Sequence, residues 1–290
     1  MTIGVKKEMM TEVMKGMRMI RNIVILVFLA GSISVAADFK DKDFDGVPDS
    51  VDQCPNTPFL HQVNAKGCTT QKLMLLSDTV TDSLVLSLKF GHITNEDLSG
   101  KETQRTKKIR MTYYHDDWSY ILRTGYITYA DNDEMLDTTF KIRKRFKPTP
   151  NLRLKISASL RFPTRDFIGN NTDIALSTSL NYYLTHHTSL FAGIQYTFVR
   201  DKQISTPLQN KGSFYLGTAY FFTKKLYTDF SFSYTESKFT TKYAVKSLRG
   251  AVSYDISNQW FATLSYEQDI DDDDTHNALN FTIGYRFWKD

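Results

Sequence analysis

Five aspartates and one glycine crowd into residues 41–52. Counted from Asp41 as position 1, the carboxylates fall at positions 1, 3, 5, 9 and 12 and the glycine at position 6: Asp41, Asp43, Asp45, Gly46, Asp49 and Asp52. Alternate oxygens that converge on one point, a glycine at a sharp turn and a backbone carbonyl at position 7 are the chemistry of a calcium-binding loop. Val47 occupies that seventh position. The sequence therefore predicts calcium as a cofactor, and the alternative is a flexible acidic linker that binds no metal.

The residues around this loop resemble a thrombospondin type 3 repeat. The pattern D-x-D-x-D-G-V-P-D-x-x-D-x-C-P-N-T-P, followed by V-N-A-x-G-C, lies within residues 38–69. Such repeats are found in bacterial envelope proteins, notably as linkers in the outer-membrane protein A family. The resemblance implies that the five aspartates bind calcium and that Cys54 pairs with Cys68. A unit of about thirty residues is too small to fold on a core alone, so it needs a metal or a disulfide.

The N-terminal residues have the features of an export signal. Lys15, Arg18 and Arg21 precede the apolar stretch 23–30, and the small residues 35–37 follow before Asp38. This order is typical of a signal peptide, which we expect to be residues 1–37, with Met14 or Met17 as the start; the alternative is a membrane-anchor helix. In an exported chain, two closely spaced cysteines also favour a disulfide.

The rest of the chain alternates between apolar and polar residues, which is the period of a β-strand. In 152–162, for example, the residues of one parity, the even-numbered positions, are all apolar, and those of the other parity are Arg, Lys and Ser. The pattern predicts a linker at 70–79 and a barrel domain at 80–290. We expect twelve strands at 82–92, 106–114, 118–129, 136–146, 152–162, 173–184, 189–199, 213–222, 226–235, 244–254, 259–268 and 278–288.

The connections between these strands alternate between long and short. Short turns at one end, longer loops at the other and an even strand number are typical of outer-membrane barrels, and the barrel region resembles the porin-like ones. The prediction is an all-β, twelve-stranded antiparallel transmembrane barrel in the outer membrane of a Gram-negative bacterium, in contact with lipid and with both termini in the periplasm. A soluble sandwich or barrel is the alternative, but twelve strands would leave a void if the apolar face pointed inward.

The polar parity of the strands then faces the lumen. It carries Lys89 and, as predicted pore-lining residues, Lys108, Arg110, Arg123, Lys141, Arg143, Arg145, Arg153, Lys155, Arg161, Arg249 and Arg286. Walls of Arg and Lys favour the passage of anions. In the hairpin that joins 136–146 to 152–162, we expect Arg145 to lie near Arg153 and Arg143 near Lys155. The alternative is a plugged barrel whose cations pair with acids of the loops or of the lumen, and the acid-rich outer loops could supply such partners.

The remaining composition excludes several classes of function. The formal charge of +4 is nearly balanced, and no basic stripe carries a nucleic-acid reader motif. None of the six histidines alternates with a serine on the outward parity, so we expect no enzyme. Two functions remain. One is passive transport of small, anionic solutes, and the other is a non-conducting structural protein whose repeat engages a periplasmic or cell-wall partner. The oligomeric state is left open.

Overall fold

The computed structural model describes residues 47–55, 57, 61–72, 82–97, 100–129, 132–165, 169–185, 187–202, 206–223, 225–270 and 275–288. The predicted signal peptide 1–37 lies outside these residues, as do the candidate calcium ligands Asp41, Asp43 and Asp45.

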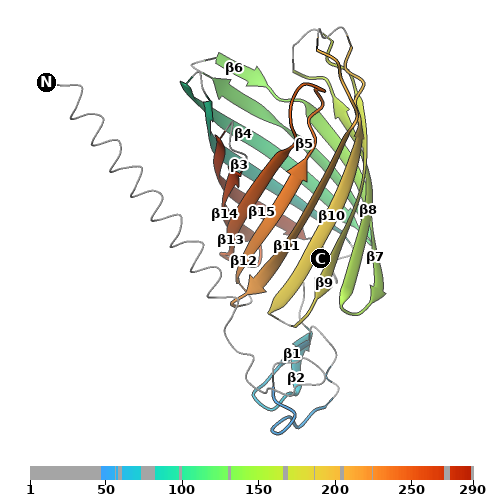
Figure 1. The fold of residues 1–290 in the computed structure, drawn as a ribbon. Coiled ribbons are helices and arrows are strands. Elements are labelled where there is room, and N and C mark those ends of the chain that lie inside the picture. The colour runs from blue at the N-terminus through green and yellow to red at the C-terminus, as the bar shows by residue number, and fades with distance from the viewer. Residues whose placement is uncertain are drawn as a thin grey trace, which may run out of the picture.

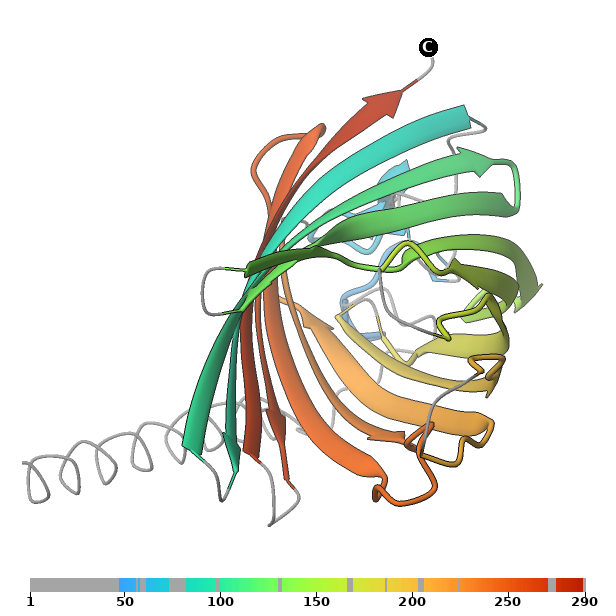
Figure 2. The ribbon, with the colours of Figure 1, turned by 90° about the horizontal axis from the view of Figure 1, so that it is seen from above.

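Within the described part of the chain, twelve antiparallel strands form a closed barrel, which confirms the predicted fold class (Figures 1 and 2). The strands are β3 (Asp82–Asp97), β4 (Gly100–His115), β5 (Trp118–Tyr129), β7 (Thr138–Thr149), β8 (Leu152–Phe162), β9 (Asp173–Tyr183), β10 (Thr188–Phe198), β11 (Lys211–Phe221), β12 (Leu226–Thr235), β13 (Val245–Asp255), β14 (Trp260–Asp269) and β15 (Thr275–Trp288). Each strand pairs with its sequence neighbour, and the ring closes where β15 pairs with β3, with Phe281 opposite Phe90. A closed ring leaves no unpaired edge, which a barrel in lipid requires.

The outer surface of the barrel is apolar and the inner surface is polar. On β4, Ile109 and Met111 are 45% and 41% exposed, while Arg110 between them lines an internal cavity. The same alternation runs around the ring, so that the exterior exposes a continuous apolar band. Aromatic side chains, among them Trp118, Trp260 and Phe287, are exposed near the strand ends, as in the girdles of membrane barrels.

The strands are longer than predicted on one side of the barrel. β3 and β4 continue past the expected limits and pair as far as Asp97 and Gly100. The short strand β6 (Asn132–Met135), which lies in the predicted loop after β5, pairs with Tyr126–Tyr129. These segments extend beyond the apolar band at the long-loop end, at the top of Figure 1. Polar residues can continue a hydrogen-bonded ladder there, so hydrophobic alternation underestimates the strand length.

The register predicted for the β7–β8 hairpin is wrong. Arg145 lies opposite Lys155 instead of Arg153, and Arg143 lies opposite Ser157 instead of Lys155. The strand continues to Thr149, and the pairing shifts between Phe146 and Thr149. Pro148 lies in this irregular segment, consistent with its lack of an N–H to donate to the ladder. The longer strand, the shorter turn and this irregularity together place the partners of Arg143 and Arg145 two positions later in β8 than predicted.

A small two-stranded sheet precedes the barrel in the chain. β1 (His61–Val63) pairs with β2 (Thr69–Lys72), and Cys54 forms a disulfide with Cys68, which confirms that pairing. The Thr57 hydroxyl donates to the carbonyl oxygen of Gly67 at 2.7 Å, so it ties the segment after Cys54 to the turn before Cys68. The described residues contain no helix long and apolar enough to cross a membrane.

Candidate functional site in the barrel lumen

The twelve basic residues expected in the lumen all lie on the inward side of their strands. Each is adjacent in sequence to outward-facing residues of the apolar band, as Lys155 is to Ile156 and Arg161 is to Leu160. Four of them line one internal cavity: Arg110, Lys155, Arg249 and Arg286. Nine of the twelve belong to β4, β5, β7 and β8, so the cations gather on one side of the barrel.

Three pairs of like charges lie directly opposite each other on neighbouring strands. Lys89 of β3 is opposite Lys108 of β4. Arg110 of β4 is opposite Arg123 of β5. The third pair is Arg145 and Lys155. Like charges in this position are destabilising unless water or counter-ions screen them.

Some of the cations have acidic partners. Arg249 pairs with Asp229, Arg286 pairs with Asp255 at 2.7 Å, and Arg145 lies 3.3 Å from Asp117. The guanidinium of Arg286 also lies 4.5 Å from the ring centre of Phe261. These pairs hold the side chains against the wall of the barrel. For these three cations, the pairing with acids that the plugged-barrel alternative requires is observed.

Other cations have no such partner in the part of the chain that the structure describes. No described acid forms a salt bridge with Lys89, Lys108, Arg123, Lys141 or Arg143. The acid that acts electrostatically on Lys89 and Lys108 is Glu267, which is not in contact with either. Arg123 lies within electrostatic range of Arg110 and Arg143. This cluster gives one wall of the lumen a positive potential.

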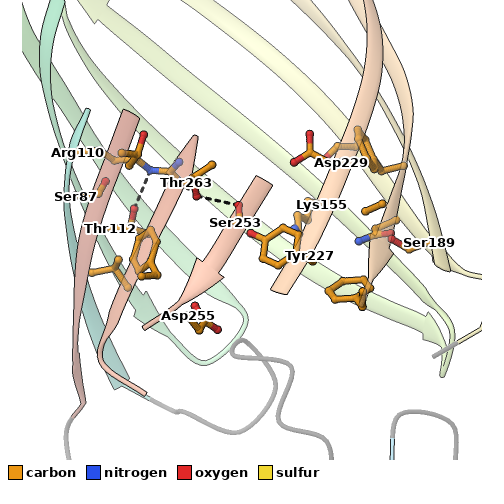
Figure 3. Close-up of a pocket in the computed structure, with 18 of the residues that line it drawn as sticks. Ser87, Arg110, Thr112, Lys155, Ser189, Tyr227, Asp229, Ser253, Asp255 and Thr263 are labelled. Atoms are coloured by element: carbon orange, nitrogen blue, oxygen red, sulfur yellow. Dashed lines mark hydrogen bonds between the residues drawn. The ribbon is translucent and has the colours of Figure 1, made fainter. Parts of the chain in front are cut away.

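The internal cavity lies toward the short-turn end of the barrel and has a volume of about 760 Å³. Figure 3 shows Arg110 on one side of it, with Lys155, Asp229 and Tyr227 on the other. Hydroxyl groups cover much of the wall between the charges, and two of them form a hydrogen bond, Ser253 to Thr263, at 2.8 Å. The wall of the cavity thus carries four cations, the two acids Asp229 and Asp255, and many hydroxyl groups.

Aromatic rings line the lumen opposite glycines, a feature that the sequence analysis missed. Phe191 of β10 lies opposite Gly217 of β11, and Tyr215 of β11 lies opposite Gly193 of β10. A Cβ atom on Gly217 would meet the Phe191 ring at 2.5 Å, and one on Gly193 would meet the Tyr215 ring at 2.6 Å. Each ring therefore lies over the neighbouring glycine, flat against the wall. The signal in the sequence was the presence of aromatic residues at alternate positions that are otherwise mostly polar.

A second polar cluster lies at the long-loop end and holds the loops together. Arg161 contacts three aspartates, namely Asp137, Asp173 at 2.7 Å and Asp201 at 2.8 Å. The side chain of Asp201 is 0% exposed and also accepts a hydrogen bond from Lys238 at 2.7 Å. The loops before β7, after β8 and after β10 thus meet at one arginine, and the loop after β12 joins them through the contact of Lys238 with Asp201.

Two carboxylates of this cluster, those of Asp137 and Asp201, stay ionised to low pH. Burial favours the neutral form of Asp201, but hydrogen bonds from Lys238, from the Asn171 amide and from Arg161 outweigh it, so the pKa of Asp201 is lowered. Burial acts on Asp137 in the same way, and hydrogen bonds from Asn170, from the Arg165 amide and from Arg161 lower its pKa. Both groups lie in loops, outside the strands.

Three of the predicted calcium ligands are described. Val47 is buried, and an Asp52 carboxylate oxygen accepts a hydrogen bond from the Cys54 amide at 2.8 Å; the third is Asp49. No three His, Cys, Asp or Glu side chains come together as a metal site among the described residues. The donor set is all oxygen, which suits calcium. With Asp41, Asp43 and Asp45 outside the described residues, the calcium site stays a prediction.

No protein-family model and no curated protein matches the chain. Solved structures with a similar fold are outer-membrane proteins. The COG4313 outer membrane channel from Pseudomonas putida F1 matches with a TM-score of 0.60 and 12% identity, over 72% of this chain and 96% of that one. The NanC porin matches with a TM-score of 0.54 and 9% identity, over 69% and 98%. The KdgM porin in complex with disordered oligogalacturonate matches with a TM-score of 0.50 and 12% identity, over 69% and 99%. The chain therefore has the twelve-stranded barrel fold found in outer-membrane channels.

Proposed function

We propose that the protein is an outer-membrane channel for the passive passage of small, anionic solutes. The observation that carries this proposal is the set of like-charged pairs facing the lumen, Lys89 with Lys108, Arg110 with Arg123 and Arg145 with Lys155. Apolar or oppositely charged residues at these positions would make a more stable barrel. A wall of this kind concentrates anions in the lumen and repels cations.

A barrel of similar fold, that of KdgM, has been solved with an anionic solute. That porin was solved with oligogalacturonate, a chain of sugar acids, and its barrel is similar to this one at 12% identity. The likeness concerns the fold, so the argument for anions rests on the residues of this chain. The proposal assigns no catalytic reaction to the barrel.

The proposal also sets the orientation of the protein in the Gram-negative envelope. Both ends of the barrel chain, at Asp82 and Trp288, lie at the short-turn end. We place that end in the periplasm, after removal of the signal peptide 1–37, and the long loops outside the cell. The segment 38–69 would then be a periplasmic calcium-binding repeat, available to a periplasmic or cell-wall partner.

The test is the reversal potential of the purified barrel in a planar lipid bilayer with a potassium chloride gradient. The expected result is a conducting pore whose reversal potential lies toward the chloride equilibrium potential. Cation selectivity would overturn the anionic assignment. Absence of any conductance in several lipid compositions would favour the alternative function.

That alternative is a non-conducting structural barrel, and the cluster around Arg161 favours it. Three aspartates from separate segments hold this arginine at the long-loop end. Ion pairs of this kind fix loops above a barrel. They do not explain the lumen cations for which no described acid forms a salt bridge, so we place the channel first.

A further inference from the structure

The lumen contains a row of side chains in which a cation and an aromatic ring face each other across two small residues. Strand pairing aligns Lys155 of β8 with Ser179 of β9, and Ser179 with Gly193 of β10. Gly193 in turn lies opposite Tyr215 of β11. Neighbouring strands are ~4.8 Å apart, so the backbones of Lys155 and Gly193 are ~10 Å apart.

The ring of Tyr215 extends over Gly193 into this row. Its Cε1, Cζ and hydroxyl oxygen all lie 2.6 Å from the place where a Cβ of residue 193 would be. Tyr215 also packs against Phe191, with ring centres 6.2 Å apart, and both rings line the same cavity as Lys155. Tyr215 is 39% exposed, so part of the ring faces the open lumen.

A second cation, on the adjoining strand, adds positive charge to the same region of the lumen. Arg143 of β7 lies within electrostatic range of both Tyr215 and Tyr114. No described acid forms a salt bridge with Arg143. The region above Ser179 is thus bounded by positive charge on one side and by ring faces on the other.

We propose that this row is a solute-binding subsite for a carboxylate carried on a ring. The carboxylate lies at Lys155 and Arg143, the apolar face of the ring stacks on Tyr215 and Phe191, and Ser179 and Gly193 leave the space between them. The inference rests on the proposed function and narrows its solute. A compact anion such as chloride or acetate would interact only with the positive charges, whereas a ring-bearing carboxylate would also stack on the aromatic rings.

Two ring chemistries share this description, because an aromatic ring and the C–H face of a sugar ring both stack on tyrosine. The probes are therefore benzoate and glucuronate, with acetate as the carboxylate that has no ring. Binding is measured by isothermal titration calorimetry on the full-length chain in detergent micelles, which does not depend on conduction. Stacking predicts that at least one ring-bearing probe binds about threefold to tenfold more tightly than acetate.

The variants test the contribution of ring stacking to binding separately from the contribution of charge. Tyr215→Ala should reduce the preference for the ring-bearing probe over acetate to about one, and Tyr215→Phe should keep it. Lys155→Gln should weaken the binding of the ring-bearing probe and of acetate alike. Gly193→Ala should act like Tyr215→Ala, because the added methyl displaces the ring from the wall. Gly250→Ala is the matched control, since no atom lies within 4 Å of the place of its Cβ.

The outcomes distinguish this subsite from the channel itself. Equal binding of benzoate, glucuronate and acetate to the wild type overturns the subsite, even where the pore is chloride-selective in bilayers. A preference that survives Tyr215→Ala overturns it as well. Loss of the preference in Gly193→Ala, with the preference retained in Gly250→Ala and Tyr215→Phe, supports it. A barrel that conducts no anions overturns the proposed function and is measured separately.

Discussion

Arg145 of β7 and Lys155 of β8 lie directly opposite each other, and both point into the lumen. Arg145 is held near Asp117, and Arg143 follows on the same inward face. These three of the six inward-facing cations of β7 and β8 thus lie close together along the solute pathway. Because the pairing register brings them together, their combined potential is a property of the hairpin and not of any single residue.

Reversing two of these charges should change the ion selectivity. Arg143→Glu combined with Lys155→Glu is expected to shift the reversal potential in a salt gradient toward cations. The effect should shrink at high salt, because the Debye length falls from ~10 Å at 0.1 M to ~3 Å at 1 M. The control is Arg105→Glu with Lys107→Glu, which makes the same change of net charge on exposed, outward-facing residues of β4. An equal shift in the control would mean that the lumen wall does not set selectivity.

Removing the arginine at the long-loop end should loosen the loops. Arg161→Met leaves Asp137, Asp173 and Asp201 without their shared cation, and loss of one partner of a buried ion pair costs on the order of 3–5 kcal/mol. We expect faster cleavage of the long loops by external protease while the barrel stays folded. Arg200→Met, a change at an exposed arginine nearby, should leave the cleavage rate unchanged. Unaltered cleavage in Arg161→Met would show that other contacts hold the loops.

The same cluster predicts how the loops respond to acid. The folded-state pKa values of Asp137 and Asp201 are lowered, so their contribution is complete above their unfolded pKa of about 4 and is lost as the pH falls through the lower folded values. Hydrogen exchange of the long loops should therefore be flat, after correction for the intrinsic rate, from pH 7 to about pH 5, and should rise below about pH 4. Loosening between pH 5 and pH 7 would contradict this assignment.

The orientation can be tested with single cysteines, because the only two native ones, Cys54 and Cys68, form a disulfide. Tyr243, which is 88% exposed, lies in the long connection between β12 and β13, and Thr149 lies at the opposite end of the barrel. On intact cells, a membrane-impermeant maleimide should label Tyr243→Cys and not Thr149→Cys. After the outer membrane is permeabilised, both should react. The reverse pattern on intact cells would place the long loops in the periplasm.

The calcium prediction concerns the N-terminal repeat and is independent of the barrel. Five carboxylates in twelve residues repel one another unless a cation neutralises them. Asp43→Ala with Asp45→Ala should abolish calcium-dependent protection of residues 38–69 from protease, and the melting temperature of the barrel should not change. Asp116→Ala, in the β4–β5 turn, is the control and should retain protection. If calcium does not alter cleavage of the wild-type repeat, the ligand assignment is wrong.

Residue alternation was sufficient to predict the barrel and the face that each cation occupies, because a strand has only two faces. Alternation does not specify which residues pair across strands. Because β7 continues to Thr149 and its pairing shifts between Phe146 and Thr149, the partners of Arg143 and Arg145 differ from those predicted. The cluster of Arg161 with Asp201 could not be predicted either, since its members are forty residues apart and meet only when the loops fold over the barrel. Tyr215 could have been found as an aromatic residue on the polar parity. Its glycine partner depends on the register.

The uneven placement of charge also makes the lumen electrically asymmetric from one wall to the other. Cations gather on β4, β5, β7 and β8, while Asp229, Asp255 and Glu267 lie on the inward faces of β12, β13 and β14. The electric field inside the barrel therefore has a transverse component that points from the first wall to the second. A dipolar solute is turned sideways by such a field as it enters, with its negative end toward β7 and β8. Isomers of equal size and net charge should consequently cross at different rates when their charges are separated differently.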